Sequence, residues 1–115
     1  MSDGALILPD LLRRVWADQI VWAPFREGVE IHQIYQLPDS GSAAALLRYA
    51  PGAAVPEHEH SGHEHILVLS GSQIDARGEH LAGTLVVNLP GTRHSVSSPR
   101  GCVVYVVWAR PVVFV

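Results

Sequence analysis

Short apolar runs closed by turn residues recur along this chain. Prolines, glycines, aspartates and serines interrupt the sequence about every eight to twelve residues, a rhythm typical of an all-β sandwich or barrel. No long stretch repeats its apolar positions with a helical period. We therefore expect an all-β fold with strands over 29–37, 43–49, 55–60, 64–69, 73–76, 84–89, 94–97 and 102–108.

The first 22 residues read differently from the rest. Residues 4–16 open as an apolar run that could begin as a strand, and Pro9-Asp10 then permits one or two helical turns over 11–16. At 115 residues the chain has the usual size of one domain. We interpret it as a single domain, 1–115, with an N-terminal extension (1–22), a barrel core (43–110) and a terminal strand (111–115).

Candidate metal ligands gather in the glycine-bounded fragment 52–71. His58 and His60 are separated by one residue, so an extended strand places both side chains on one face. Glu64 follows a Ser-Gly step that can turn the chain, and a second glycine-bounded fragment ends at His94. Three imidazoles and one carboxylate suit zinc, iron, manganese, nickel or copper better than calcium or magnesium. We expect one divalent metal on His58, His60, Glu64 and His94, with Zn as first choice and Fe(II), Mn, Ni or Cu as alternatives.

A histidine-rich surface tract that binds metals only adventitiously is the alternative. Residues 58–65 hold four of the seven histidines, so a His-x-His pair among them carries little weight by itself. That alternative does not explain the glycines that frame the tract or the distant His94.

The spacing of these residues resembles that of the cupin family. The first cupin motif is a glycine, five residues, His-x-His, three or four residues, a glutamate, six residues and a glycine. This chain matches it at Gly52, His58, His60, Glu64 and Gly71, and it matches the second motif at Gly83, Gly91 and His94. Leu89 stands where the second motif has a proline and Ser98 where it has an asparagine, and neither departure touches a ligand.

Flanking phrases resemble the ChrR-like branch of the cupins. They are V-W-A-P-F-R-E-G-V-E-I-H near the start, L-L-R-Y-A-P-G-A before the histidines and S-P-R-G-C after them. The resemblance implies the cupin double-stranded β-helix, a jelly-roll-like barrel, with a metal and a small-molecule ligand inside it. ChrR-like cupins include the C-terminal half of zinc-dependent anti-sigma factors. This sequence lacks paired cysteines, so we carry over only the metal-binding half.

Alternation along the strands predicts which side chains accompany the ligands. If Glu64 points into the barrel, Ile66 and Val68 do too and form an apolar floor. His94 then shares its face with Val96. An apolar barrel with convergent polar ligands is the usual construction of a small-molecule pocket.

Other polar residues are expected outside the ligand set. His63 and His65 have the opposite parity to Glu64 and belong at the surface or behind the ligands, and we expect His80 at the surface. Glu57 and Glu59 should face away, which leaves no free inward carboxylate near the site. The sequence leaves open whether the pocket is also lined by His32, Arg48 or Tyr49.

Composition argues against several classes of partner. The net charge is −3, with no lysine and eight scattered arginines, so no basic face for nucleic acid is expected. No apolar run reaches the length of a membrane span, and the start lacks a secretory signal pattern. The lone cysteine, Cys102, fits a reducing compartment and a small buried apolar role. We expect a cytoplasmic protein that binds neither nucleic acid nor membrane.

The C-terminal segment 102–115 is apolar on both faces of a strand, so neither face should be left in water. Pro111 lacks a backbone donor and should break the strand or hold it at a sheet edge. We expect a homodimer in which the tail 111–115 or the segment 5–8 packs across the subunit boundary.

Three functions are compatible with these observations. The first is a metal-binding cupin with an unknown small-molecule ligand, such as a sensor or regulatory binding protein. The second is a metal-dependent cupin dioxygenase acting on a small organic substrate, because four protein ligands leave one or two coordination positions open. The third is a metal-stabilised barrel without a bound substrate. The lack of a positioned proton carrier argues against acid–base isomerisation, and we place the binding function first.

Overall fold

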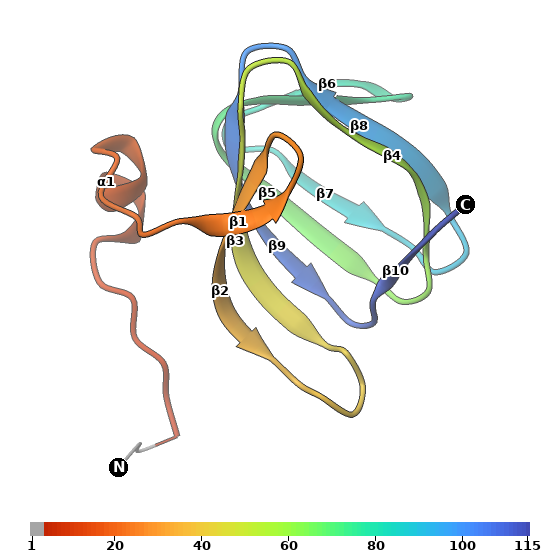
Figure 1. Cartoon of the computed structure of the whole chain (residues 1–115), viewed down its shortest axis with the longest axis horizontal. Helices are drawn as coiled ribbons and strands as arrows, with labels where there is room; N and C mark the ends of the chain where they lie inside the picture. The colour runs from red at the N-terminus through yellow and green to blue at the C-terminus, as the bar shows by residue number, and fades with distance from the viewer. Residues whose placement is uncertain (1–3) are drawn as a thin grey trace.

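The computed structural model describes residues 4–115, which form a nearly all-β fold of antiparallel strands with one short helix (Figure 1). The helix α1 spans Leu11–Trp16 and has the bounds expected from the sequence. The strands are β1 (Ala23–Arg26), β2 (Val29–Gln36), β3 (Ala43–Tyr49), β4 (Ala53–His60), β5 (Glu64–Asp75), β6 (Gly78–Leu81), β7 (Leu85–Asn88), β8 (Arg93–Ser98), β9 (Cys102–Trp108) and β10 (Val112–Phe114).

The strands form one curled sheet that bends over on itself. Its hydrogen-bonded order is β1-β2-β3-β9-β5-β8-β4-β10, while β6 and β7 pair with β5 outside this path. In Figure 1 the side that contains β4 and β8 curls over the side that contains β3 and β9. The expected all-β barrel is therefore confirmed.

The long strand β5 corrects the expected strand boundaries. The expected segments 64–69 and 73–76 fall in one strand that runs through Gly71 and ends at Asp75. The register of β5 against β9 shifts between Val68 and Ser70, their pairing ends at Gly71, and β5 continues along β6 from Ser72. Gly71 has φ +70, and a Cβ atom there would overlap the carbonyl oxygen of Gly101. Only glycine fits this close crossing of two backbones without strain.

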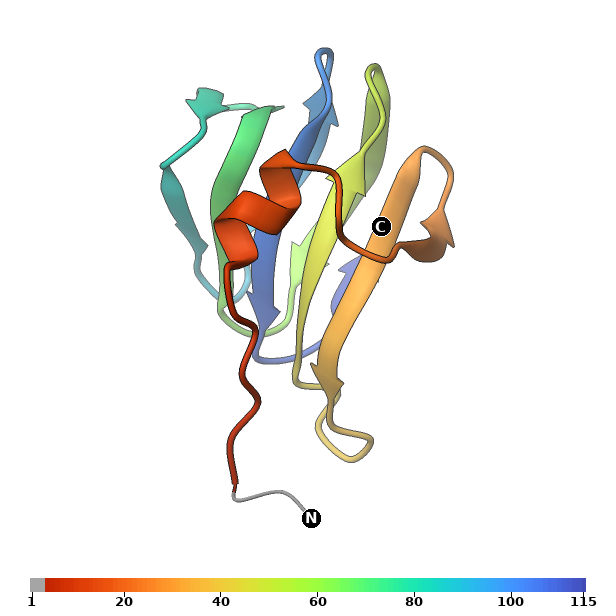
Figure 2. The same cartoon turned by 90° about the vertical axis from the view of Figure 1, so that its left-hand side faces the viewer.

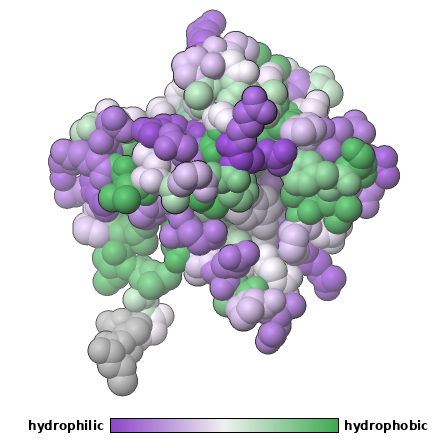
Figure 3. All heavy atoms as spheres, viewed as in Figure 1, coloured by the Kyte–Doolittle hydropathy of each residue, from purple (hydrophilic) through white to green (hydrophobic). Residues whose placement is uncertain are grey.

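Two short strands were not expected, and one expected strand is absent. β1 and β6 are mostly exposed, so neither shows an apolar pattern that would identify it in the sequence. Residues 5–8 do not form a strand, which corrects the expectation for the start of segment 4–16. Leu6 and Ile7 are 66% and 78% exposed, and Figure 3 shows apolar atoms on this segment where it leaves the barrel.

The apolar core has two parts, one on each face of the sheet. The larger part fills the barrel and includes Val29, Ile31, Ala45, Leu47, Tyr49, Val55, Ile66, Val68, Val86, Val96, Cys102, Val104 and Val106. Cys102 is therefore a small buried core residue, as expected. The smaller part lies under α1, which crosses the outer face of the sheet (Figure 2). The Trp16 indole nitrogen attaches the helix by donating to the Leu69 carbonyl oxygen at 3.1 Å.

The chain turns back on itself before its C-terminal end. β9 ends at Trp108, and Pro111 lies just before β10, the last strand on its edge of the sheet. The expectation that Pro111 breaks the strand is confirmed. β10 pairs with β4, the strand that carries two of the candidate ligands. In the part of the chain that the structure describes, no helix is long and apolar enough to cross a membrane.

Candidate metal centre

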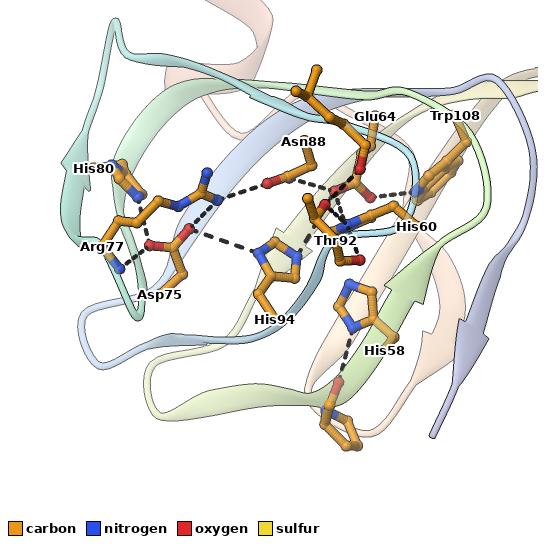
Figure 4. A network of polar contacts seen from close by, with 12 residues as sticks. His58, His60, Glu64, Asp75, Arg77, His80, Asn88, Thr92, His94 and Trp108 are labelled. Atoms are coloured by element: carbon orange, nitrogen blue, oxygen red, sulfur yellow. Dashed lines mark hydrogen bonds and ion pairs between the residues drawn. The ribbon is translucent and has the colours of Figure 1, made fainter.

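Three neighbouring strands bring the four predicted ligands together inside the barrel. β4 carries His58 and His60, the turn after it leads to Glu64 at the start of β5, and β8 places His94 directly opposite His58. One donor atom from each residue lies within 4.8 Å of the others. All four side chains are buried, between 1% and 7% exposed, and they converge on one point in Figure 4.

Backbone carbonyl groups orient the rings of the two β4 histidines. His58 Nδ1 lies 2.9 Å from the Pro56 carbonyl oxygen, and His60 Nδ1 lies 3.1 Å from that of Thr92. A carbonyl oxygen only accepts hydrogen bonds, so both Nδ1 atoms must carry the proton. The unprotonated Nε2 atom of each ring is then free to bind a metal, which is a common arrangement in metalloproteins.

Two buried ring nitrogens test whether these residues fit a metal. His60 Nε2 and His94 Nδ1 have no hydrogen-bond partner in the described structure. His60 Nε2 lies 3.0 Å from Glu64 Oε1, but the geometry there is not that of a hydrogen bond. Most buried polar atoms have a partner, so an unpaired Nε2 beside a buried carboxylate needs an explanation. A divalent cation bound to His60 Nε2 and Glu64 would supply it, so the donor set fits a metal.

The Glu64 carboxylate is held at both oxygens. Asn88 Nδ2 donates to Oε1 at 2.9 Å, and Trp108 Nε1 donates to Oε2 at 2.6 Å. Burial by itself raises the pKa of Glu64, but the adjacent His60 and the hydrogen bond from Asn88 outweigh it and lower that pKa. The carboxylate is therefore ionised at neutral pH, which is the form that binds a cation.

His94 is neutral at the same pH. Burial lowers its pKa to about 4, and repulsion from His58 and His60 adds to the effect against the attraction of Glu64. Its Nε2 atom lies 3.9 Å from Glu64 Oε1, on the side of the ring that faces the other ligands. A neutral imidazole that faces a carboxylate in this way is ready for metal binding without loss of a proton.

Asp75 corrects the expectation that no free carboxylate points inward. Its side chain is 2% exposed, and its Oδ2 atom lies 3.7 Å from His94 Nδ1. Sequence parity missed it because the register shift in β5 changes the inward set from even positions such as Ile66 to odd positions such as Gln73. No apolar pattern marks such a shift. The one sequence signal of a shift in β5 was Gly71, which lies between two strand-like segments.

His80 also departs from its expected place at the surface. It lies on β6, its side chain is only 17% exposed, and its Nε2 atom lies 2.9 Å from Asp75 Oδ1. Burial raises the pKa of Asp75, but hydrogen bonds from His80 and Arg77 prevail and lower it to about 2. An ionised carboxylate therefore lies behind His94.

The structure also places the remaining polar residues that the sequence offered as candidates. His63 and His65 are exposed, as their parity predicted. His32 bonds to the Val21 carbonyl oxygen, away from the ligands, and Arg48 pairs with Glu30 on the outer face. Tyr49 is the residue of the three open candidates that lines the pocket.

An apolar cavity of about 90 Å³ adjoins the ligands. Its polar lining includes Tyr49, Gln73 and Trp108, and Arg26 and Phe114 contribute to its wall. Burial raises the pKa of the Tyr49 hydroxyl above its ordinary value, so this group stays protonated. The complete lining is Phe25, Arg26, Val29, Leu47, Tyr49, Val55, His58, Glu64, Ile66, Gln73, His94, Val96, Val104, Val106, Trp108, Val112 and Phe114.

A curled antiparallel barrel with three histidines and a glutamate buried at its centre defines a cupin. The chain belongs to the ChrR cupin-like domain family, and the model of that family matches residues 13–112. No curated protein matches it.

Several solved structures share this fold. A protein of unknown function with a cupin-like fold from Ralstonia eutropha JMP134 is 24% identical, with a TM-score of 0.70 over 75% of this chain and 62% of that one. An acetylacetone dioxygenase from Acinetobacter johnsonii is 16% identical, with a TM-score of 0.78 over 100% of this chain and 79% of that one. A chain in the complex of Rhodobacter sphaeroides SigE with the anti-sigma ChrR is 26% identical, with a TM-score of 0.68 over 79% of this chain and 49% of that one. This chain therefore spans less than two thirds of the R. eutropha protein and about half of the chain from the SigE complex.

Proposed function

We propose that this protein binds one divalent transition metal through His58, His60, Glu64 and His94 and holds a small molecule in the adjoining cavity. The observation that carries the proposal is the unpaired, buried His60 Nε2 beside the ionised Glu64. Zinc is our first choice because imidazole nitrogens and carboxylate oxygens are among its usual protein ligands. Such a metal would act as a Lewis acid toward a ligand atom that reaches it.

The lining of the cavity favours binding over acid–base catalysis. Its walls are mainly apolar, and its volume of about 90 Å³ suits a small ligand. Among the described residues that line it, Glu64 is engaged by Asn88 and Trp108, and Tyr49 holds its proton. Asp75 lies behind His94 and is not part of the lining. This arrangement supports a sensor or regulatory binding protein for a small, largely apolar ligand.

Metal analysis of protein purified without an affinity tag or nickel column tests the proposal. We expect about one metal ion per chain in the wild type and in His63→Ala, whose side chain is exposed. We expect loss of the tightly bound metal in His94→Ala, because this change removes one of four buried donors. Stoichiometric metal in His94→Ala together with its loss in His63→Ala would show that the histidine tract binds alone.

A metal-dependent dioxygenase is the second candidate. Its support is the similarity to the A. johnsonii acetylacetone dioxygenase over the whole of this chain. At 16% identity this similarity shows a shared fold alone. An oxygen electrode can test it with iron-loaded protein and acetylacetone as the trial substrate. Oxygen uptake that requires both would favour the enzyme. Tightly held zinc, with no uptake by the iron-loaded form, would favour the binding protein.

A further inference from the structure

The Arg77 side chain connects two polar groups behind the metal centre. Its Nη2 atom donates to Asn88 Oδ1 at 2.7 Å and to Asp75 Oδ2 at 2.9 Å, as Figure 4 shows. Its backbone nitrogen also donates to Asp75 Oδ1 at 2.8 Å. The turn between β5 and β6 thus places one guanidinium against residues from two different strands.

The first connection leads to Glu64. Because Asn88 Oδ1 accepts from Arg77, the amide must present Nδ2 to the other side, where it donates to Glu64 Oε1 at 2.9 Å. Without the guanidinium, Asn88 Oδ1 loses its donor and the amide is held in this orientation from the Glu64 side alone. Arg77 therefore fixes the second end of the amide that holds this ligand.

The second connection leads to His94. Asp75 Oδ2, bonded to Arg77, lies 3.7 Å from His94 Nδ1, which has no hydrogen-bond partner. This distance is too long for a hydrogen bond, but a small movement would close it. A carboxylate behind a metal-binding histidine orients the ring and strengthens it as a ligand.

We propose that Arg77 is a positioning residue that sets the metal affinity by holding two ligands, Glu64 through Asn88 and His94 through Asp75. No sequence motif includes it, and its side chain is 55% exposed. This role rests on the proposed metal site and adds a control point outside it. Because both connections pass through one side chain, its loss disturbs both ligands together.

The matched control is Arg93, because its ion pair does not lead to a candidate ligand as the contacts of Arg77 do. Its side chain is also 55% exposed, and it pairs with one carboxylate, that of Glu59, at 3.0 Å. Arg93 is adjacent in sequence to His94, and Glu59 lies between His58 and His60, yet in the described structure the Glu59 side chain has no hydrogen bond or ion pair with any of the four candidate ligands. A merely structural surface ion pair would therefore give the same result at both positions.

The experiment measures zinc affinity by competition with a chromophoric chelator for the full chain and its variants. We expect Arg77→Ala to weaken zinc binding roughly 10- to 100-fold and Arg93→Ala to change it less than about threefold. Arg77→Lys should fall between, because its ammonium keeps the positive charge but lies one bond closer to the backbone than the Nη2 atom that reaches both partners. The absorption bands of the cobalt-substituted protein should shift in Arg77→Ala and stay unchanged in Arg93→Ala.

The outcomes separate this inference from the proposed function. If the wild type binds no zinc or cobalt, the metal site and the role of Arg77 are both wrong. If the wild type binds zinc and Arg77→Ala matches Arg93→Ala in affinity and spectrum, only the role of Arg77 is wrong. Should Arg77→Ala fail to fold, Arg77→Lys takes its place: weakened zinc binding with a shifted cobalt spectrum would support the proposal, and wild-type affinity with an unshifted spectrum would overturn it.

Discussion

Replacing Gly71 by alanine should damage this fold far more than the same change at Gly52. Both glycines have positive φ, +70 and +87, so an alanine at either position meets a similar conformational penalty. At Gly52 the new Cβ has no atom within 4 Å, whereas at Gly71 it overlaps the Gly101 carbonyl oxygen and lies 3.0 Å from the Cys102 Cα atom. The pair therefore separates backbone strain from steric overlap.

The expected magnitudes follow from these two terms. Holding alanine in the left-handed region costs about 1–2 kcal/mol, offset by about 0.4–1 kcal/mol because alanine restricts the unfolded chain. Gly52→Ala should therefore lower the free energy of unfolding by about 1 kcal/mol. Gly71→Ala adds a forced separation of β5 from β9, and overpacking of this kind costs about 1–3 kcal/mol more. We expect a total of about 3 kcal/mol, a large share of the about 5–15 kcal/mol that holds a domain together.

Urea unfolding of the metal-free proteins, followed by circular dichroism, measures both changes on one scale. The same perturbation should weaken metal binding in Gly71→Ala, because Asp75 and Arg77 lie on the far side of the crossing. Equal stability of the two variants within about 0.5 kcal/mol would refute the argument, since it would show that the crossing relaxes at no cost.

Three further outcomes are expected. Chelation of the metal should lower the melting temperature without loss of the β circular dichroism signal. A metal at about a thousand times its dissociation constant adds about 4 kcal/mol, so its removal should lower the melting temperature by on the order of 15 °C. An unchanged melting temperature would contradict tight binding. The pKa of Asp75 is lowered to about 2, so its stabilising contribution is complete above its unfolded pKa near 4 and is lost as the pH falls toward 2. The metal-free wild type should lose about 2 kcal/mol over that interval relative to Asp75→Asn, and parallel pH profiles would show that the carboxylate is not stabilised. We also propose a homodimer, because Val113 and Phe114 at the sheet edge and Leu6 in segment 5–8 remain exposed. Light scattering should give twice the mass of one chain, and a monomer whose mass per particle is unaffected by deletion of 111–115 would disprove the proposal.

The candidate ligand set was accessible from the sequence because its spacing depends on local geometry. His58 and His60 share a face through the alternation of a single strand, and Glu64 follows after one tight turn. The strands 43–49 and 102–108 have the expected bounds, since both are buried central strands whose apolar runs end at turn residues. His94 came from the second glycine-bounded fragment and was supported by the family resemblance, because parity alone could not connect it to the other three.

Only the tertiary structure decided what surrounds those ligands. The register shift near Gly71 reverses the parity of β5, so Asp75 turns inward although the alternation from Glu64 places it outward. The choice between Arg48 and Tyr49 likewise depended on which face of β3 meets the barrel interior. Arg77 and Asn88 meet through a turn and a separate strand, and neither belongs to a sequence pattern. Local alternation determines which side chains share a face, but a shift of one residue and the curl of the sheet determine which face is inside.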